Sequence, residues 1–402
     1  MTPNLRHIYV CHVVAQLGSI SAAARQVHLS QPAVTQAVAS MEDFFATQLF
    51  VRRSAGVTLT PAGEIALERI ARAIAQLQEA LSDLLRRRDQ PTNGIQRIVW
   101  RLSSAQLTAL AAFAEHKEFT RAARASGIAA PTLHRAARTL ERTLELPLFE
   151  KTSFGVRPTR DAETFARRVR LVFGELLQAR ADVDALSGGT SGVTVIGAMP
   201  LARSFIIPSA LIAFVRGHPD HSVSIMEGTY EHLFAALQAG EADFLIGALR
   251  PARVAADVQQ EHLFDDPLSI VVRAGHPLAT RKHLRPADLA RYPWIAPRLT
   301  SPLRAQFDEL FAAAGVAAPA YPVQCNSLIA ARAFLLESDC MMLSSVHQIH
   351  YELRAGMLVA LPHPQGRVVR AIGLTMRRNW QPTRAQMRLL DLIRERARAD
   401  ER

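Results

Sequence analysis

Histidine is the side chain of this sequence with the widest use in catalysis and metal binding, and its spacing here offers neither. His276 stands in a Gly-His-Pro turn, with no neighbouring nucleophile or carboxylate to give it a catalytic role. His347 and His350 are three residues apart, but no third ligand lies nearby in sequence, so we expect them to cap a helix or face solvent. The patterns G-x-S-x-G, H-E-x-x-H, the Walker loop and the Rossmann glycines are all missing. We therefore expect no enzyme, no metal and no cofactor.

The cysteines and the composition indicate a soluble protein of a reducing compartment. Cys11, Cys325 and Cys340 form no C-x-x-C pair and cannot make a disulfide scaffold. The chain has 402 residues, 49% of them apolar, which is enough for two or three domains with cores of their own. Its longest mostly apolar stretch, residues 205–215, is too short to cross a bilayer, and the N-terminus is predicted to be a helix rather than a signal peptide. We expect a cytoplasmic protein without a membrane partner.

An excess of basic residues points to a polyanionic partner. Lys and Arg number 47 against 36 Asp and Glu, and residues 1–190 alone hold 24 basic and 17 acidic residues. Neutralisation of phosphates provides most non-specific affinity for nucleic acid, so the basic N-terminal half favours such a partner. A plain bias towards arginine is the alternative explanation.

The first half of the chain is an internal duplication. Residues 19–25 align with residues 118–124, and the same offset of 99 continues without a gap through 64 and 163. Over those 46 positions 13 are identical, including the Leu-Phe pair at 49–50 and 148–149. We call residues 1–62 and 104–160 copy 1 and copy 2.

Each copy is predicted to be a small helical unit with a hairpin. In copy 1, Ser30 is a good N-cap and Pro32 suits the first turn of a helix that follows closely on another. Two helices joined by so short a turn form a helix-turn-helix, whose second helix enters the major groove of DNA. Residues 49–53 and 57–59, with Gly56 between them, predict a two-stranded wing.

The residues of copy 1 resemble the winged helix-turn-helix of LysR-type transcriptional regulators. The resemblance rests on "SISAAARQVHLSQPAVTQAVASME", "LFVRR" and "VTLTPAGE", which occur in order at the spacing of that family. It implies that Gln31, Pro32, Ala33, Thr35 and Gln36 face base edges. A Gln amide can bond bidentately to adenine, and small side chains can meet a thymine methyl. Arg52 and Arg53 in the wing would hold phosphates or the minor groove, the alternative being solvated charge.

Copy 2 departs from this pattern where copy 1 would read DNA. Ser30 and Gln31 become Ala129 and Ala130, whereas the apolar scaffold positions survive. Two interpretations stay open: a copy that binds the DNA backbone with little selectivity, and a purely structural copy. The arginines that would bind the backbone are Arg121, Arg124, Arg135 and Arg138.

A long amphipathic helix follows each copy, over residues 63–88 and 161–190. Apolar residues step by three and four through both segments, which is typical of a helix that packs along another helix. The family resemblance implies that this segment pairs subunits, giving a homodimer or homotetramer through the linker helices. The connector 89–103 is long enough for the two copies to pair within one chain, and pairing between chains is the rival.

Residues 191–402 show alternating strands and helices, which predict a mostly parallel sheet with helices on both faces. This half resembles the effector-binding region of the same family, a two-lobed fold like periplasmic binding proteins, through "HPDHSVSIMEG", "LQAGEADFLIGALR", "DDPLSIVVRAGHPLA", "YPWIAP" and "GMLVALP". Lobe 1 is expected over 191–263 and 370–402, and lobe 2 over 264–369. The expected fold is therefore multidomain α plus α/β, with two winged helix-turn-helix units and their linker helices before a two-lobed effector domain.

A ligand site is expected where the strands of the two lobes end at helix N-termini. Hydroxyls, free helix N–H groups and an arginine there suit a small anion, either a sugar-like acid or an aromatic or other organic acid. Ser301 and Arg304 are expected to face this cleft from lobe 2. Helix capping is the alternative role for Thr229, Ser301 and Ser327. The candidate residues are Ala198, Met199, Pro200, Arg203, Ser204, Gly228, Thr229, Tyr230, Ser301, Asn326 and Ser327.

Together these features predict a sequence-specific regulator of transcription that binds double-stranded DNA, with RNA polymerase as a further expected partner. An effector that closes the two lobes would change the spacing of the DNA-binding heads and the bend of the DNA. The alternative is a small-molecule (solute) binding protein with structural helices in front.

Overall fold

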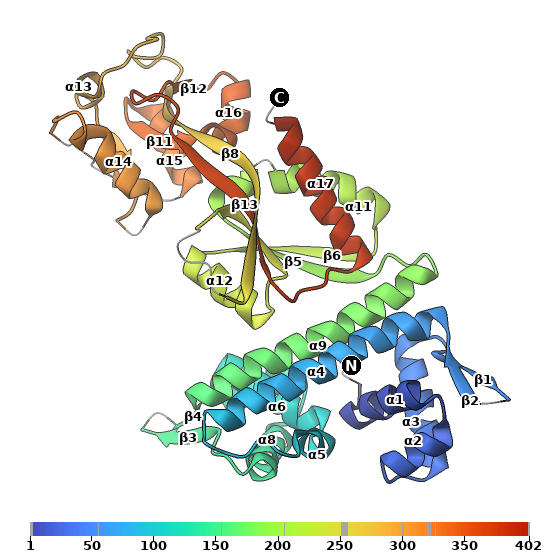
Figure 1. The fold of residues 1–402 in the computed structure, drawn as a ribbon. Helices are drawn as coiled ribbons and strands as arrows, with labels where there is room; N and C mark the ends of the chain where they lie inside the picture. Colours follow the sequence, from blue (N-terminus) through green and yellow to red (C-terminus); the bar gives the residue numbers. More distant parts are fainter. Residues whose placement is uncertain are drawn as a thin grey trace.

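The computed structural model describes residues 3–400 except 55, 154, 205, 251–255, 300, 318, 320, 322 and 326. Copy 1 and copy 2 have the same order of elements (Figure 1). In copy 1 the elements are α1 (Leu5–Leu17), α2 (Ile20–Gln26), α3 (Gln31–Phe45), β1 (Phe50–Arg53) and β2 (Gly56–Leu59), and the linker helix α4 (Pro61–Arg86) follows them. In copy 2 they are α6 (Ser104–His116), α7 (Phe119–Ser126), α8 (Ala130–Leu144), β3 (Phe149–Thr152) and β4 (Gly155–Pro158), and the linker helix α9 (Arg160–Leu186) follows them.

Local hydrogen bonds repeat between the copies at the offset of 99. The Glu42 carboxylate accepts from the N–H groups of Leu49 and Phe50, which joins α3 to the hairpin. Glu141 makes the same two bonds to Leu148 and Phe149 in copy 2. The side chains of Thr60 and Thr159 likewise cap α4 and α9. The duplicated sequence therefore folds twice in the same way, because the residues that cap helices and anchor the hairpin are retained.

The linker helices α4 and α9 pack against each other within one chain, and they run antiparallel. Arg69 contacts Asp182, and Arg168 contacts Asp83 near the other end of the pair. These two ion pairs are equivalent, since 99 residues separate Arg69 from Arg168 and Asp83 from Asp182. The helices are thus related by a pseudo-two-fold axis that passes between the two ion pairs, as in a symmetric dimer interface.

A single hydrophobic core runs through both copies, from Leu5 to Val183. The backbone N–H of Leu5 donates to the Ser104 Oγ at 2.8 Å, and these residues are again equivalent by the offset of 99, as expected where they lie beside the axis. Helix α5 (Ile95–Arg101) forms inside the connector, and Trp100 packs edge-on against Tyr9. The apolar stripes of α4 and α9 therefore cover each other within one chain.

The second half of the chain is α/β and contains a nine-stranded sheet with the order β10-β9-β11-β8-β13-β7-β5-β6, with β12 paired to β8. Strand β8 (Val258–Arg273) and strand β13 (Val369–Arg377) run antiparallel through both lobes. Lobe 1 adds β5 (Gly192–Ala198), α10 (Pro200–Ser204), α11 (Ile206–Gly217), β6 (His221–Glu227), α12 (Tyr230–Ala239), β7 (Phe244–Ala248) and α17 (Arg384–Asp400). Lobe 2 adds α13 (Pro286–Leu289), β9 (Trp294–Ala296), α14 (Pro302–Ala312), β10 (Val323–Gln324), α15 (Leu328–Glu337), β11 (Met341–Ser345), the 3-10 helix η2 (Val346–Ile349), α16 (His350–Arg354) and β12 (Leu358–Leu361).

Within each lobe the strands that carry the expected site are parallel. Strand β5 pairs in parallel with β6 and β7, and β9 pairs in parallel with β10 and β11. Separate groups of buried apolar residues fill the two lobes, around Phe244 in lobe 1 and around Trp294 in lobe 2. The carboxyl ends of the parallel strands therefore meet between the lobes, where α10 contacts η2.

Candidate functional site

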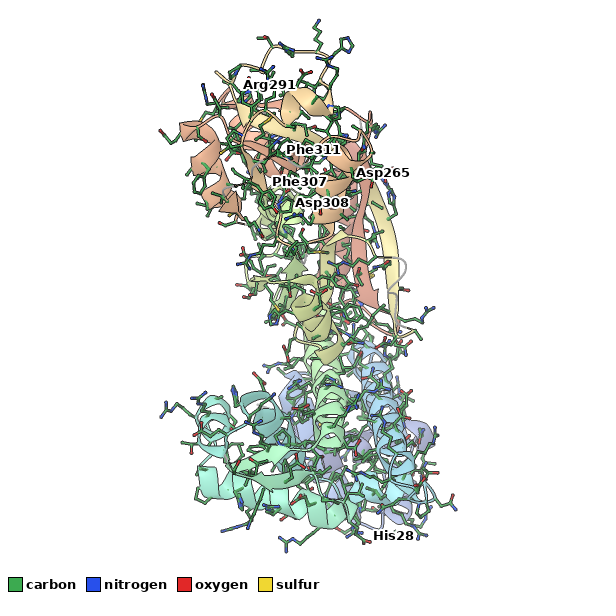
Figure 2. The ribbon with its side chains drawn as sticks, turned by 90° about the vertical axis from the view of Figure 1, so that its left-hand side faces the viewer. His28, Asp265, Arg291, Phe307, Asp308 and Phe311 are labelled. Carbon is green, nitrogen blue, oxygen red and sulfur yellow. The ribbon has the colours of Figure 1, made fainter. Side chains whose placement is uncertain are left out.

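The candidate DNA-reading edge is one exposed side of α3. The turn before it contains His28, which has φ of 53°, and the Ser30 side chain caps the helix by accepting from the Ala33 N–H. Val34, Ala37, Val38, Met41 and Phe45 form the buried side. The five predicted readers are at least partly exposed, and Gln31, Pro32 and Gln36 are fully so. Figure 2 shows His28 at the end of the molecule opposite to the effector lobes, so this edge is open to a large partner.

The side chain of Gln31 is oriented by a hydrogen bond to α2. Its Nε2 donates to the Ser21 Oγ at 3.0 Å, from the first turn of α3 back to α2. An amide nitrogen carries two hydrogens, so one N–H and the carbonyl oxygen are left for a base edge. That pair is what bidentate recognition of adenine requires.

The wing carries two exposed arginines. Arg52 and Arg53 end β1 and are exposed. The hairpin is held to the α1–α2 corner by a bond from the Val57 N–H to the Gly18 carbonyl at 2.9 Å. Gly56 has φ of 142°, and a Cβ there would lie 2.3 Å from the Gly18 oxygen, so only glycine fits this approach. The arginines therefore sit on an anchored hairpin.

The arginines of copy 2 divide into two groups. Arg121 pairs with Glu118 at 2.9 Å, and Arg138 pairs with Glu141 at 2.7 Å. Arg124 and Arg135 are exposed and make no ion pair among the described residues. Ala129, at the N-cap of α8, provides no side-chain cap. Two of the four predicted backbone binders are thus partly neutralised by glutamates of their own copy.

The lobe 1 side of the expected effector cleft has a polar rim over a buried floor. Ala198 is buried at the end of β5, and Met199 packs into the core of lobe 1 below it. Thr229 caps α12, its side chain accepting from the His232 N–H. Pro200 is exposed, Ser204 and Gly228 lie at the same edge, and the Arg203 side chain falls outside the described residues. The Arg250 guanidinium lies 3.9 Å from the centre of the Tyr230 ring and pairs with Glu231 at 3.1 Å. The sequence analysis did not single out Arg250.

On the lobe 2 side the expected hydroxyls serve as helix caps. Ser301 caps α14, and Ser327 caps α15 by accepting from the Ala330 N–H. Asn326 lies outside the described residues. Arg304, which was expected to face the cleft, bonds to Asp308 through its Nε at 2.9 Å, and its guanidinium lies over the ring of Tyr321. That charge is committed to lobe 2 itself.

A buried carboxylate lies at the strands that join the lobes, and no pattern in the sequence singled it out. Asp266, on β8, is 0% exposed and pairs with Arg370 of β13 at 2.6 Å. The Ser345 Oγ donates to the same carboxylate from the end of β11, and the His347 Nε2 lies 3.6 Å away. The expectation that His347 caps a helix or faces solvent was therefore wrong, because this charge draws it inward. Burial of a charge is tolerated only with such partners.

Lobe 1 docks on the linker helices through arginines. Arg69 is 5% exposed and donates to Asp182 at 2.6 Å and to the backbone carbonyl of Gln381 at 3.2 Å. Arg72 joins Glu175 to the carbonyl of Asn379 at 2.8 Å, and the Arg384 N–H donates to Asp182 at 3.1 Å. The segment between β13 and α17 is thus held to both helices by charged groups.

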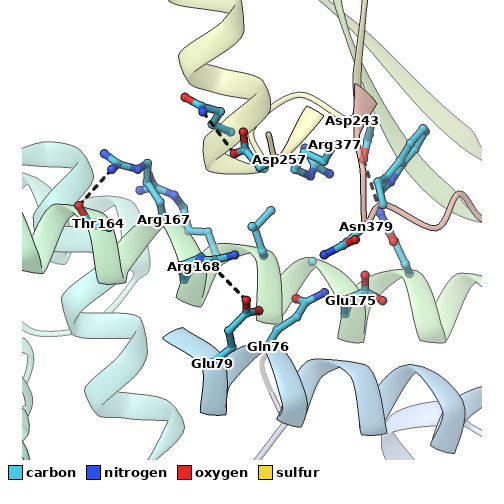
Figure 3. A pocket seen from close by; sticks show the side chains of 17 residues that line it. Gln76, Glu79, Thr164, Arg167, Arg168, Glu175, Asp243, Asp257, Arg377 and Asn379 are labelled. Atoms are coloured by element: carbon cyan, nitrogen blue, oxygen red, sulfur yellow. Dashed lines mark hydrogen bonds and ion pairs between the residues drawn. The ribbon is translucent and has the colours of Figure 1, made fainter. Parts of the chain in front are cut away.

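A cavity of about 310 Å³ lies beside this docking network (Figure 3). It lies between α9, α4 and lobe 1 rather than in the predicted cleft, and Arg168 and Glu79 line its helical side. Burial raises the pKa of Asp243 on its far side, although the Val195 N–H and Arg377 oppose that shift. Burial also lowers the pKa of Arg377, against the attraction of Asp243. This junction is therefore polar and largely internally paired.

In the part of the chain that the structure describes, no three or more His, Cys, Asp or Glu residues come together as a metal site would require. No described helix is both long enough and apolar enough to cross a membrane.

Family profiles match nearly all of these elements. The profile described as "Bacterial regulatory helix-turn-helix protein, lysR family" matches twice, over residues 5–64 and 104–163. The profile described as "LysR substrate binding domain" matches residues 187–398. The matches begin and end close to the limits of the two copies and of the α/β half.

Known transcriptional regulators are similar in sequence to this chain over most of its length. The chain is 34% identical over 393 residues to the HTH-type transcriptional regulator GalR of Pseudomonas putida, a match that covers 98% of this chain and 97% of the relative. It is 29% identical over 299 residues to PcaQ of Agrobacterium fabrum, covering 74% of this chain and 96% of that one. A full-length OxyR variant from Pseudomonas aeruginosa has a similar fold, with a TM-score of 0.55 at 21% identity over 73% of this chain and 94% of that one.

Proposed function

The chain belongs to the LysR family of transcriptional regulators, and from that premise we propose how it reads DNA and where its effector binds. Copy 1 inserts the exposed edge of α3 into the major groove, while Arg52 and Arg53 hold the DNA backbone or the minor groove. The single observation that supports this most is the Gln31 side chain, which is fixed by its hydrogen bond to Ser21 on an edge of α3 where Gln36 is also exposed. Copy 2 is a second winged helix-turn-helix that keeps its scaffold.

Substitutions in copy 1 test the assignment. Gln31→Ala should lower affinity for the preferred duplex roughly tenfold to hundredfold and leave affinity for random duplexes unchanged. Arg52→Ala should weaken binding to all duplexes and reduce the dependence of log K on log salt by about one ion. Fluorescence anisotropy with labelled duplexes at several salt concentrations measures both. Arg367→Ala, an exposed site in lobe 2, is the matched control for loss of a charge. Equal losses on every duplex from Gln31→Ala would remove its reading role.

The effector site that we propose is the cleft between the two lobes, in a fold like that of periplasmic binding proteins. Support comes from the carboxyl ends of β5, β6 and β7, which face lobe 2, and from the α10–η2 contact. Arg250 lies two residues beyond the end of β7 and pairs with Glu231, and Arg370 near the start of β13 pairs with Asp266. The buried Nε of Arg370 has no hydrogen-bond partner among the described residues, and a small organic acid, sugar-like or aromatic, would accept from that N–H.

Calorimetric titration with gluconate and with benzoate, as representatives of the two acid classes, tests the cleft. Binding of either acid that Arg370→Met weakens at least tenfold, with Arg367→Met unchanged, supports the proposal. Binding unaffected by Arg370→Met places the effector elsewhere. A regulator of chromosomal DNA would act in the bacterial cytoplasm, and closure of the cleft would be its signal.

A further inference from the structure

The N-terminal half of one chain is built as a dimer that has become covalent. Arg69–Asp182 and Arg168–Asp83 are the same contact made twice, and Leu5 meets its own equivalent, Ser104, beside the axis. Repetition of a contact about an axis is the mark of an isologous dimer interface. Here both halves of that interface belong to one polypeptide, so each chain presents two recognition helices, α3 and α8.

The two heads are placed at opposite ends of the helix pair. Hairpin β1–β2 lies at one end of α4 and α9, and hairpin β3–β4 lies at the other (Figure 1). Helix α4 has 26 residues, which at about 1.5 Å per residue separates its ends by roughly 39 Å. One turn of B-DNA spans about 34 Å, so two heads at about this separation suit successive major grooves on one face of a duplex.

The outward edge of α8 carries different chemistry from that of α3. Thr132, His134 and Arg135 occupy the positions that Ala33, Thr35 and Gln36 occupy in copy 1, and all three are exposed. Leu133, Ala137, Leu140 and Leu144 form the buried side, so α8 presents the same edge as α3. Gln36 has thus been replaced by an arginine that faces outward.

Arg135 is available for DNA whereas its neighbours are occupied. Arg138, one turn further on, is bound to Glu141, and Arg121 of α7 is bound to Glu118. Arg135 makes no ion pair with any residue that the structure describes. A helix-borne arginine in the major groove bonds bidentately to the O6 and N7 atoms of guanine, the commonest specific contact to DNA. Residues 118–158 also hold seven basic and four acidic residues, against three and two in residues 19–59.

We propose that α8 is a second reading helix with its own base preference, so that one chain recognises a non-palindromic site. The half-site under copy 1 is read by glutamines and favours adenine, and the half-site under copy 2 is read by Arg135 and favours guanine. This inference rests on the proposed function of copy 1, and it differs from a copy 2 that only clamps phosphates or only supports the fold.

Selection of bound duplexes from a random pool by the full-length protein is the first test. The expected result is two unlike half-sites about one helical turn apart, with one chain for each pair of half-sites as measured by native mass spectrometry. Recovery of a palindrome that needs two chains would overturn the proposal. Failure to select any sequence, by contrast, would overturn the function proposed for copy 1.

Single substitutions then assign the halves. Arg135→Ala should reduce affinity for the selected site roughly tenfold to hundredfold and erase base preference in the second half alone. Gln31→Ala should erase it in the first half alone. Arg124→Ala, another exposed arginine of copy 2, is the control and should weaken all duplexes alike. If Arg135→Ala weakens binding to all duplexes alike, as expected for Arg124→Ala, copy 2 only holds phosphates. If neither substitution changes the affinity for DNA, copy 2 is structural. Either outcome refutes the proposal that α8 reads bases. Circular dichroism melting of each variant checks that the fold is unchanged.

Discussion

Truncation of Arg69 to alanine should separate the linker helices from lobe 1, and the duplication provides its own control. Arg69 is 5% exposed and serves Asp182 and Glu175 together, at 2.6 and 3.3 Å. Removing one partner of a buried ion pair leaves an uncompensated charge and costs about 3–5 kcal/mol. Its equivalent, Arg168, has a side chain that is 40% exposed and lies 3.4 Å from Asp83, so the loss there should be about 0–1 kcal/mol.

Equilibrium unfolding in urea, followed by tryptophan fluorescence, measures the difference. Trp380 is the natural reporter because it precedes the docked carbonyl of Gln381. With an m value of about 2–3 kcal/mol/M, Arg69→Ala should move the midpoint of the docking transition down by about 1–2 M. Because the chain has several domains, that transition is fitted separately from the unfolding of lobe 2.

A second variant distinguishes lost charge pairing from lost packing. Asp182→Asn added to Arg69→Ala removes the orphaned charge and should recover part of the lost stability. If Arg69→Ala costs no more than Arg168→Ala, the buried pair does not hold the domains together and the reasoning fails. If the double variant regains no stability over Arg69→Ala, the stability lost in Arg69→Ala comes from packing and not from the orphaned charge.

Three further outcomes follow from the structure. Ser30→Ala should lower the melting temperature of copy 1, because it removes a helix cap worth about 1 kcal/mol. Ala129→Ser should stabilise copy 2 by a similar amount, because it adds the missing cap. Scanning calorimetry should show equal and opposite shifts, and no shift in either variant would contradict this expectation. Burial, reinforced by the nearby His218, lowers the pKa of His221 below 6.5 in the folded protein. The unfolded chain therefore takes up the proton at a higher pH, so the free energy of unfolding should fall as the pH drops below about 6.5. His221→Gln should make that fall less steep in urea titrations between pH 7.5 and 5.5, and an unchanged slope would exclude His221 as a contributor. Burial also raises the pKa of the Cys11 thiol, which keeps this cysteine protonated. A disulfide reagent at pH 8 should therefore label the half-exposed Cys325 in the folded protein and react with Cys11 only after unfolding. Cys325→Ser is the control, because it should remove the labelling of the folded protein.

Docking through charged groups has a consequence for signalling. Arg69, Arg72 and Asp182 bind the β13–α17 segment of lobe 1, whereas Asp266 and Arg370 join lobe 1 to lobe 2 through the crossing strands. Lobe 1 is therefore fixed to the DNA-binding half, and closure of the cleft would move lobe 2 relative to both.

The amino-acid sequence determined the local units of this protein. Caps such as Ser30, the anchoring glutamates and the alternation of strands and helices act over a few residues, so they can be recognised without knowledge of the fold. The offset of 99 established the duplication, and the α3 edge followed from capping and periodicity together. The family resemblance then assigned the edge its partner.

Only the tertiary structure decided which surfaces meet. An apolar stripe shows that a helix must be buried but not against what, and α4 proved to be covered by α9 of the same chain. Whether an arginine is free or paired depends on residues distant in sequence or on rotamers that no pattern records, which is why the Arg304–Asp308 pair was not predicted and Asp266 was missed. Local order is written in neighbouring residues, whereas ion pairs such as Arg69 with Asp182 join positions 113 residues apart and exist only once the chain has folded.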